Sequence, residues 1–465
     1  MTTKRFRQLV VSAMLVLTAG APAFAKDLGD ILLKKGLITE EELKQAREEE
    51  KQKSAAEESK RDAVAAKVPQ WLDRITLFAD LRTRYEGFEG NGLHGRNRFR
   101  LRARPGLTAK ISDEVSGTVR LASGNSDDPI STNQSFERTF TRKPINLDQA
   151  YLTLRPGKTF GLEPGLIEIN AGKFGINAYR ASELIWDDDL SPEGASETFT
   201  LLNEREGFLR NVKLTGFQWV MDEITAGSDP GMYGGQVVAN TAFTELVQWN
   251  LGFADYNYQH LNGVARKFLN AFNDPPTNSK ANSSFNGQLA NSNDVVKDAN
   301  GKILGYTSGY NIVNGTTELL FTNPLGIGLP VGFFGDVAYN TQADGKNVGA
   351  NVGVGIGKAG RDYYHNGLKN PGDWGASYTY GWVEKDAVLS LFSYSDVDYV
   401  QAKATQKGST NLISHILRFD YQLLPNLQLT AKEHIINALD RKASNAKLTG
   451  NPSLFRTQID AVLKF

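Results

Sequence analysis

The chain has 465 residues, no cysteine, and equal numbers of basic and acidic side chains, 52 of each. The lack of cysteine excludes disulfides, thiolate metal sites and haem attached through C-x-x-C-H, and it agrees with passage through an oxidising compartment. A neutral charge balance supplies no broad basic surface, so we expect no nucleic acid as a partner. We expect no cofactor and no resident metal.

The first 25 residues have the pattern of a secretory signal peptide. Basic residues at positions 4, 5 and 7 precede a mostly apolar stretch from Leu9 to Leu17, and Ala23-Phe24-Ala25 is a small-x-small cleavage site. A membrane-anchoring helix is the alternative, but the apolar stretch is short for one. We therefore expect export into the periplasm with cleavage near Ala25.

Residues 26–68 form a region of different composition, dense in Glu, Lys and Ala and without aromatic residues. The pattern predicts a short amphipathic helix that ends at Gly36 and a charged helix that begins at Thr39. Residues 28–39 resemble the small helical hairpin at the N-terminus of type II secretion ATPases, which is an interaction module. The resemblance implies a periplasmic arm for a partner, the cell wall or self-association. A solvated helical spacer is the alternative.

From Trp71 to Phe465 the pattern changes to strands in which apolar and polar residues alternate. The first predicted strands cover residues 74–88, 96–111, 115–123, 147–154 and 166–172. The connections between them alternate between short and long, as periplasmic turns and extracellular loops do in membrane β-barrels. This alternation makes residues 173–196 the third extracellular loop.

Further strands are expected along the rest of the chain, at 207–217, 246–258, 317–322, 331–340, 348–357, 375–383, 389–394, 413–423 and 427–436. Residues 262–301 are expected to form a large extracellular loop. The final strand, 455–465, ends on Phe465. It resembles the closing strand of bacterial outer-membrane barrels, where the terminal aromatic residue is part of the assembly signal.

These patterns predict an all-β fold, a transmembrane antiparallel β-barrel of about 16 strands (16–18), preceded by a short periplasmic helical segment. The expected divisions are a signal peptide at 1–25, a helical arm at 26–68 and the barrel at 71–465. A barrel of this size has a water-filled lumen. Its outer face contacts the lipid of the outer membrane.

Arginines recur at alternate positions of the second predicted strand. A spacing of two puts them on one face, and an arginine facing lipid costs about 2–4 kcal/mol near the midplane, so that face must line the lumen. The first and third strands extend the wall. The candidate pore-lining residues are Arg82, Arg84, Arg96, Arg98, Arg100, Arg102, Arg104 and Arg120. The alternative is that carboxylates such as Asp80 and Glu86 pair with them and merely keep the lumen wet.

The third loop supplies the opposite charge through Asp187, Asp188, Asp189 and Glu193. It occupies the place at which general diffusion porins fold a loop inward to narrow the channel. Acidic residues facing an arginine wall would create a transverse field that orders polar solutes. A calcium site built on the three aspartates and an unstructured surface loop remain alternatives.

Four segments together resemble the bacterial "putative porin" family: Asp80–Gly87, Arg96–Arg104, Arg120–Pro129 and residues 172–194. The resemblance covers about 71–200 and the C-terminal strand. It implies an outer-membrane diffusion channel for small hydrophilic solutes or ions and names no substrate. With the arginine wall, we expect a weak anion preference, and we expect a homotrimer. A fainter similarity to phosphate-selective porins and alginate exporters leaves a substrate-specific anion or oligosaccharide channel open.

An enzyme is not expected. His94 and His260 lie in predicted loops, and His415 is next to Ser414 in a strand, where adjacent side chains face opposite sides. A scaffold barrel that sheathes a partner protein, such as a redox conduit, is the remaining alternative. An unusually wide barrel, or a lumen without an inward loop, would favour it.

Overall fold

The computed structural model describes residues 39–41, 43–45, 48, 70–90, 95–137, 139–204, 206–224, 227–269, 291–358, 367–400, 407–440 and 453–465. The predicted signal peptide and most of the predicted arm lie outside these residues. The described part of the arm contains helical residues after Thr39, whose carbonyl accepts a hydrogen bond from the Leu43 N–H at 3.0 Å. None of the helices in the described part of the chain is long and apolar enough to cross a membrane.

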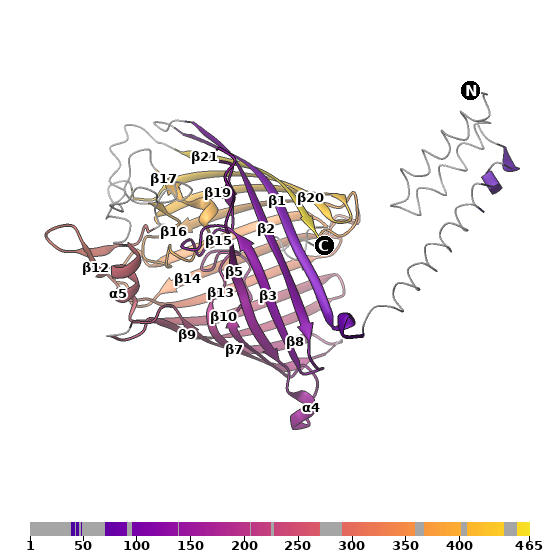
Figure 1. The fold of residues 1–465 in the computed structure, drawn as a ribbon, viewed down its shortest axis with the longest axis horizontal. Helices are drawn as coiled ribbons and strands as arrows, with labels where there is room; N and C mark the ends of the chain where they lie inside the picture. Colours follow the sequence, from indigo (N-terminus) through magenta and orange to yellow (C-terminus); the bar gives the residue numbers. More distant parts are fainter. Residues whose placement is uncertain are drawn as a thin grey trace. The chain divides into compact units, whose positions relative to one another are not determined.

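Sixteen strands form a closed antiparallel barrel (Figure 1). Each strand pairs with its neighbours in chain order, and β21 closes the barrel by pairing with β1. The barrel strands are β1 Ile75–Gly90, β2 Arg96–Lys110, β3 Val115–Ser123, β5 Ile145–Leu154, β6 Ile167–Lys173, β7 Glu193–Asn203, β8 Leu209–Val220, β9 Gly231–Thr244, β10 Val247–Gln259, β13 Asn311–Phe321, β14 Val331–Asn340, β15 Val348–Gly357, β16 Trp374–Val383, β19 Leu412–Leu424, β20 Leu427–Ala438 and β21 Leu454–Lys464.

One shorter element precedes β1, and the others lie in the connections. They are η1 Gln70–Arg74, β4 Gln134–Ser135, α4 Gly157–Phe160, α5 Leu261–Val264, η2 Ala265–Leu269, β11 Val295–Lys297, β12 Ile303–Tyr306, η3 Ser395–Val397, β17 Tyr399–Val400 and β18 Lys407–Gly408. The connections at one end of the barrel are mostly short turns and those at the other are mostly long loops, which is the predicted alternation.

The predicted closing strand is confirmed. β21 is antiparallel to β1 over its whole length. One residue beyond it, the Phe465 carbonyl accepts a hydrogen bond from the Ala79 N–H at 2.9 Å, and the Phe465 N–H donates to the Ala79 carbonyl at 3.1 Å. The strand completes the sheet, so no edge remains where β1 and β21 meet.

The period of two separates the faces of the wall. Large apolar side chains such as Phe99, Phe253 and Ile459 are more than half exposed on the outside, where a bilayer covers them. Their sequence neighbours face the lumen and are mostly polar. The predicted all-β antiparallel barrel is confirmed, with 16 strands.

The strand prediction is wrong in two places. Residues 389–394 form turns instead of a strand, because Leu389 and Leu391 are buried in an apolar core inside the barrel. Strand β9 was not predicted. Its inward residues include Met232 and Val238, which are also buried, as well as the polar Gln236, so the inward face mixes apolar and polar residues and the alternation is blurred.

Two loops fold into the lumen. They are residues 174–192 between β6 and β7, called here the third loop, and the described residues 384–400 and 407–411 between β16 and β19, called here the seventh loop. Trp186 of the third loop and Leu389 of the seventh pack in one apolar core with inward side chains of the wall such as Phe217 and Tyr256. The long-loop end of the barrel is thus occupied by a packed core, and an inward third loop is present.

Candidate functional site

The register of β1 and β2 determines how the predicted arginine wall is assembled. Arg82 lies opposite Arg102, and Arg84 lies opposite Arg100. Like charges directly opposite each other destabilise a sheet, so this arrangement requires carboxylates nearby. Five carboxylates supply the compensation. Three come from barrel strands and two from the inward loops.

A lower group of ion pairs lies towards the short-turn end. The Asp80 carboxylate accepts from Arg102 Nε at 2.8 Å and pairs with Arg104 Nη2 at 2.6 Å. The third loop reaches the same two arginines, because Asp189 Oδ1 lies 3.0 Å from Arg104 Nη1 and 3.4 Å from Arg102 Nη1. The other carboxylate oxygen of Asp189 accepts hydrogen bonds from the N–H and the hydroxyl of Thr132. Two arginines and two carboxylates therefore balance in this group.

An upper group lies towards the long-loop end, where β1 meets β21. Asp460 holds Arg84 through two hydrogen bonds, Nε to Oδ1 at 2.7 Å and Nη2 to Oδ2 at 2.8 Å. Asp396, from the seventh loop, pairs with Arg84 at 3.3 Å and with Arg456 at 2.7 Å. Glu86 completes the group. Its carboxylate lies 2.6 Å from Arg456 Nη2 and also forms an ion pair with Arg98.

The upper group has a positive excess. Among the described residues, five arginines in it share three carboxylates. The arginines are Arg82, Arg84, Arg98, Arg100 and Arg456, and the carboxylates are Glu86, Asp396 and Asp460. Many arginines of the wall are thus paired with carboxylates, as the alternative interpretation of these arginines requires, but the pairing is incomplete.

The two remaining predicted arginines lie apart from these groups. Arg120 on β3 pairs with Asp148 of the neighbouring strand β5. Arg96 begins β2 at the long-loop end and is exposed, and no ion pair involving it is present in the described part of the structure. Of the five arginines at alternate positions of β2, four therefore belong to the two groups.

The predicted acidic residues of the third loop have four different environments. Asp189 lies at the arginine wall, as described above. Asp188 pairs with Arg180 of its own loop. Asp187 accepts hydrogen bonds from the N–H groups of Ser395, at 2.9 Å, and Asp189, at 2.8 Å, so it ties the third loop to the seventh. Glu193, at the start of β7, is largely exposed and pairs with Lys173 at 3.0 Å.

The loop carboxyls differ in acidity according to their partners. Burial opposes ionisation of Asp189, but Arg102 and Arg104 outweigh it and hold the pKa of Asp189 below its ordinary value. The pKa of Asp396 is likewise held well below its ordinary value by Arg456 and Arg84, against the effect of burial. Burial, reinforced by the charge of Asp189, raises the pKa of Asp187 well above its ordinary value.

Three residues of the upper group were not predicted. Arg456 and Asp460 belong to the wet face of the last strand, so the alternation that identified that strand also marks them as lumen residues. Asp396 carries no such signal, because nothing local indicates that its loop turns inward. Among the residues that the structure describes, no group of three or more His, Cys, Asp or Glu side chains could hold a metal ion.

Comparison with known proteins identifies the family. A family model described as "Putative porin" matches residues 88–438. The chain belongs to this family. Family membership and the closed barrel support an outer-membrane porin channel. No curated protein matches the chain.

Several solved porin structures are similar to this chain at very low sequence identity. The OprB structure from Pseudomonas putida is 11% identical, with a TM-score of 0.48 over 85% of this chain and 96% of that one. An anion-selective porin from Comamonas acidovorans is 10% identical, with a TM-score of 0.43 over 84% and 99%. OmpF from Salmonella typhi, in complex with daunomycin, is 10% identical, with a TM-score of 0.42 over 84% and 97%. At these values the likeness concerns the fold alone.

Proposed function

We propose that this porin is a passive diffusion channel for small hydrophilic solutes and ions, with a weak preference for anions. The observation that carries the preference is the positive excess of the upper group. Five arginines there share three carboxylates, so an anion passing that part of the wall meets a net attractive charge. Arginine also remains charged across the whole physiological pH range.

The inward loops support a channel over a sheath for a partner protein. The third and seventh loops occupy the lumen through a shared apolar core, so a threaded partner would have to displace both of them. Their acidic side chains touch the arginine wall directly through Asp189 and Asp396. In this proposal the two loops narrow the path through the lumen. Asp189 and Asp396 lower the positive potential of the arginine wall without cancelling it.

The deciding measurement is the reversal potential of the purified porin in a planar bilayer under a KCl gradient. Stepwise conductance with a chloride-favouring potential is the expected result. A cation-favouring potential would contradict the anion preference while keeping the channel. No conductance from correctly folded protein would contradict the channel itself and leave the sheath as the better account.

A homotrimer is part of the proposal, and the outer wall offers one supporting feature. On β7 and β8, Glu197 and Gln218 face outward beside Gly216, because their neighbours Ser196 and Phe217 are buried inside. A carboxylate and an amide are poorly suited to a lipid contact, whereas a second protein wall can hydrogen-bond them.

The size of the complex in detergent tests this contact by light scattering. Gly235 lies next to Gly216 on β9, and Gly235→Trp is expected to shift trimers towards monomers. The matched control is Gly315→Trp on β13, where a side chain meets open space. An unchanged trimer in the Gly235 variant would contradict this contact surface, and a monomeric wild type would contradict the trimer.

We further propose that residues 26–68 serve as a periplasmic arm for a partner and that residues 1–25 are removed on export. Deletion of 26–68 from the full chain should leave conductance unchanged and abolish co-purification of a periplasmic component. Mass spectrometry of the exported protein should give an N-terminus near Lys26.

A further inference from the structure

The positive excess of the arginine wall can be assigned to two side chains. Among the described residues, the upper and lower groups together hold seven arginines and five carboxylates. Five of these arginines have a carboxylate oxygen within 2.8 Å. In contrast, the ion pair of Arg82 with Asp460 is 3.9 Å long, and that of Arg100 with Glu86 is 3.8 Å long. The two uncompensated charges therefore belong to Arg82 and Arg100.

Arg82 and Arg100 are diagonal neighbours on the lumen face, because the register places Arg100 two residues from the position opposite Arg82. The second loop, which connects β3 to β5, covers both of them. The Asn133 side-chain oxygen accepts from Arg82 Nη2 at 2.6 Å, and the Asn133 carbonyl accepts from Arg100 Nη2 at 3.3 Å. Ser131 Oγ also accepts from Arg100, at 3.3 Å. These three oxygens are neutral, so they satisfy hydrogen bonds without balancing the charge.

The segment that carries Asn133 is held in place on both sides. Before it, Ile130 packs into the apolar core inside the barrel, and the N–H and hydroxyl of Thr132 donate to Asp189. After it, β4 pairs with β2. The backbone beside the two arginines is thus fixed, whereas the Asn133 side chain can rotate away from Arg82.

Both arginines remain accessible from the lumen. The side chains of Arg82 and Arg100 are each 12% exposed, whereas those of Arg84 and Arg456 are 2% and 5% exposed. A guanidinium group offers its N–H donors in a planar fork that suits carboxylate and phosphate oxygens. Because both guanidinium groups already reach one residue, Asn133, a compact anion can contact both of them.

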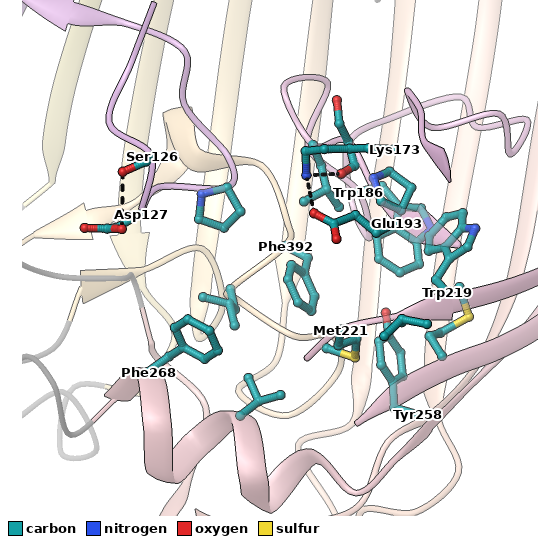
Figure 2. Close-up of a pocket in the computed structure, with 18 residues that line it drawn as sticks. Ser126, Asp127, Lys173, Trp186, Glu193, Trp219, Met221, Tyr258, Phe268 and Phe392 are labelled. Carbon is teal, nitrogen blue, oxygen red and sulfur yellow. Dashed lines mark hydrogen bonds and ion pairs between the residues drawn. The ribbon is translucent and has the colours of Figure 1, made fainter. Parts of the chain in front are cut away.

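Lys173 offers no comparable site. It lines a cavity of about 310 Å³ between the third loop, the seventh loop and the barrel wall. Figure 2 shows the Lys173 amine bonded to the Glu193 carboxylate, at 3.0 Å. Asp127 adds a second carboxylate to the lining of this cavity. An anion in the cavity would therefore face two carboxylates and a lysine that is already paired.

We propose that Arg82 and Arg100 form a binding site for a compact oxyanion with two negative charges, the class of sulfate and hydrogen phosphate. The anion takes the place of the Asn133 side chain and accepts hydrogen bonds from both guanidinium groups. Its two charges match the two uncompensated charges of the wall, so a dianion is attracted more strongly than a monoanion. This inference rests on the proposed anion preference. Binding is measurable on the purified porin without a bilayer, so the two can fail separately.

The test is isothermal titration calorimetry of the porin in a non-ionic detergent. The two probes are sulfate and nitrate, compared at neutral pH and equal ionic strength. Sulfate is expected to bind saturably, with one site per chain. Nitrate is an oxyanion with a single charge and is expected to bind at least several-fold more weakly. Absence of saturable sulfate binding would overturn the site, and equal or tighter binding of nitrate would overturn the dianion class.

Asn133→Asp tests the location of the site. It places a carboxylate next to Arg82 with little change of shape, so it removes part of the positive excess and repels a dianion. The Kd for sulfate is expected to rise at least about tenfold, the effect of losing a hydrogen bond to a charged group. The matched control is Asn240→Asp, which adds the same charge beside the uncharged Asn250 on β9, a strand that adjoins neither β1 nor β2. It should leave the Kd unchanged.

Arg82→Gln tests the same location from the other partner of the contact. It removes the longest ion pair of the upper group, so the barrel is expected to fold, and the Kd for sulfate should rise at least about tenfold. Arg155→Gln removes an equal charge outside the two groups and should leave the Kd unchanged. An unaltered Kd in both Asn133→Asp and Arg82→Gln, or equal weakening in the controls, would overturn the site.

The site and the channel give separate readouts. Saturable sulfate binding without conductance would support the site and contradict only the channel. A chloride-favouring reversal potential without sulfate binding would contradict only the site.

Discussion

Arg84 and Asp460 face each other across the seam at which the first and last strands close the barrel. The guanidinium and carboxylate make two parallel hydrogen bonds of 2.7 and 2.8 Å, and the two side chains are only 2% and 5% exposed. A planar, bidentate pair of this kind is geometrically specific. It therefore joins residues that are 376 positions apart in the sequence and helps to set the register of the closing strands.

Removing one partner of this pair should be costly. Asp460→Asn leaves Arg84 buried with a weaker partner, and breaking a buried ion pair costs about 3–5 kcal/mol. We expect a loss of this size in the free energy of unfolding, measured in urea with the folded barrel in detergent. Arg155→Gln is the control, because its pair with Glu168 is 44% and 37% exposed, and such pairs contribute at most about 1 kcal/mol. Equal losses in the two variants would contradict a special role for the seam pair.

The triple variant Arg98→Gln, Arg100→Gln, Arg102→Gln should abolish or reverse the anion preference. In the two groups taken together, arginines outnumber carboxylates in the wild type, and in the triple variant carboxylates outnumber arginines. Folding should survive, because Glu86 keeps Arg456 and both Asp80 and Asp189 keep Arg104. The measurement is the reversal potential in a KCl gradient.

The control for the triple variant removes the same charge elsewhere, through Lys110→Gln, Arg155→Gln and Lys358→Gln. These three side chains are 44–59% exposed, and each takes part in an ion pair outside the arginine groups. They should change the reversal potential far less. An unaltered potential in the triple variant of β2 would show that the ladder does not govern selectivity.

Neutralising the loop acid that touches the wall should have the opposite effect. Asp189→Asn leaves Arg102 and Arg104 with only Asp80, so the anion preference should increase. Asp188→Asn removes the same charge one residue earlier, where the carboxylate pairs with Arg180 of its own loop, and should have the smaller effect on the reversal potential. A larger shift from Asp188 than from Asp189 would contradict the role given to the contact with the wall.

The same loop should show two opposite pH dependences. Because the pKa of Asp187 is raised in the folded state, the folded porin retains a proton that the unfolded chain releases, and stability falls as pH rises above the ordinary carboxyl range near about 4. The pKa of Asp189 is lowered, so its contribution is present above that range and is lost as pH falls. Relative to wild type, Asp187→Asn should therefore gain stability from acid to neutral pH, and Asp189→Asn should lose it.

Thermal unfolding followed by circular dichroism at several pH values measures these two differences. Because each variant is compared with wild type at the same pH, titration of other groups cancels to first order. If the stability difference from wild type changed with pH in the same direction for both variants, the environments assigned to Asp187 and Asp189 would be contradicted.

The alternation of residue types determined most of the barrel. The lumen face of β2 and the closing strand both follow from a period of two, because a bilayer outside and water inside impose opposite solvents on adjacent side chains. The same rule failed at β9 and at residues 389–394. In both places apolar side chains pack against the core inside the barrel, so a buried position is not a lipid-facing one.

Residue spacing was enough to predict that a row of arginines shares one wall of the lumen and that an acidic loop follows the fifth predicted strand. The partners of those charges could be found only in the folded barrel. Asp396 lies more than 300 residues from Arg84, and Asp187 faces the seventh loop instead of the arginines. Local periodicity specifies the face on which a side chain lies, but the ion pairs depend on strand register and on the folding of two loops into the barrel. Both are set by contacts between residues far apart in the chain.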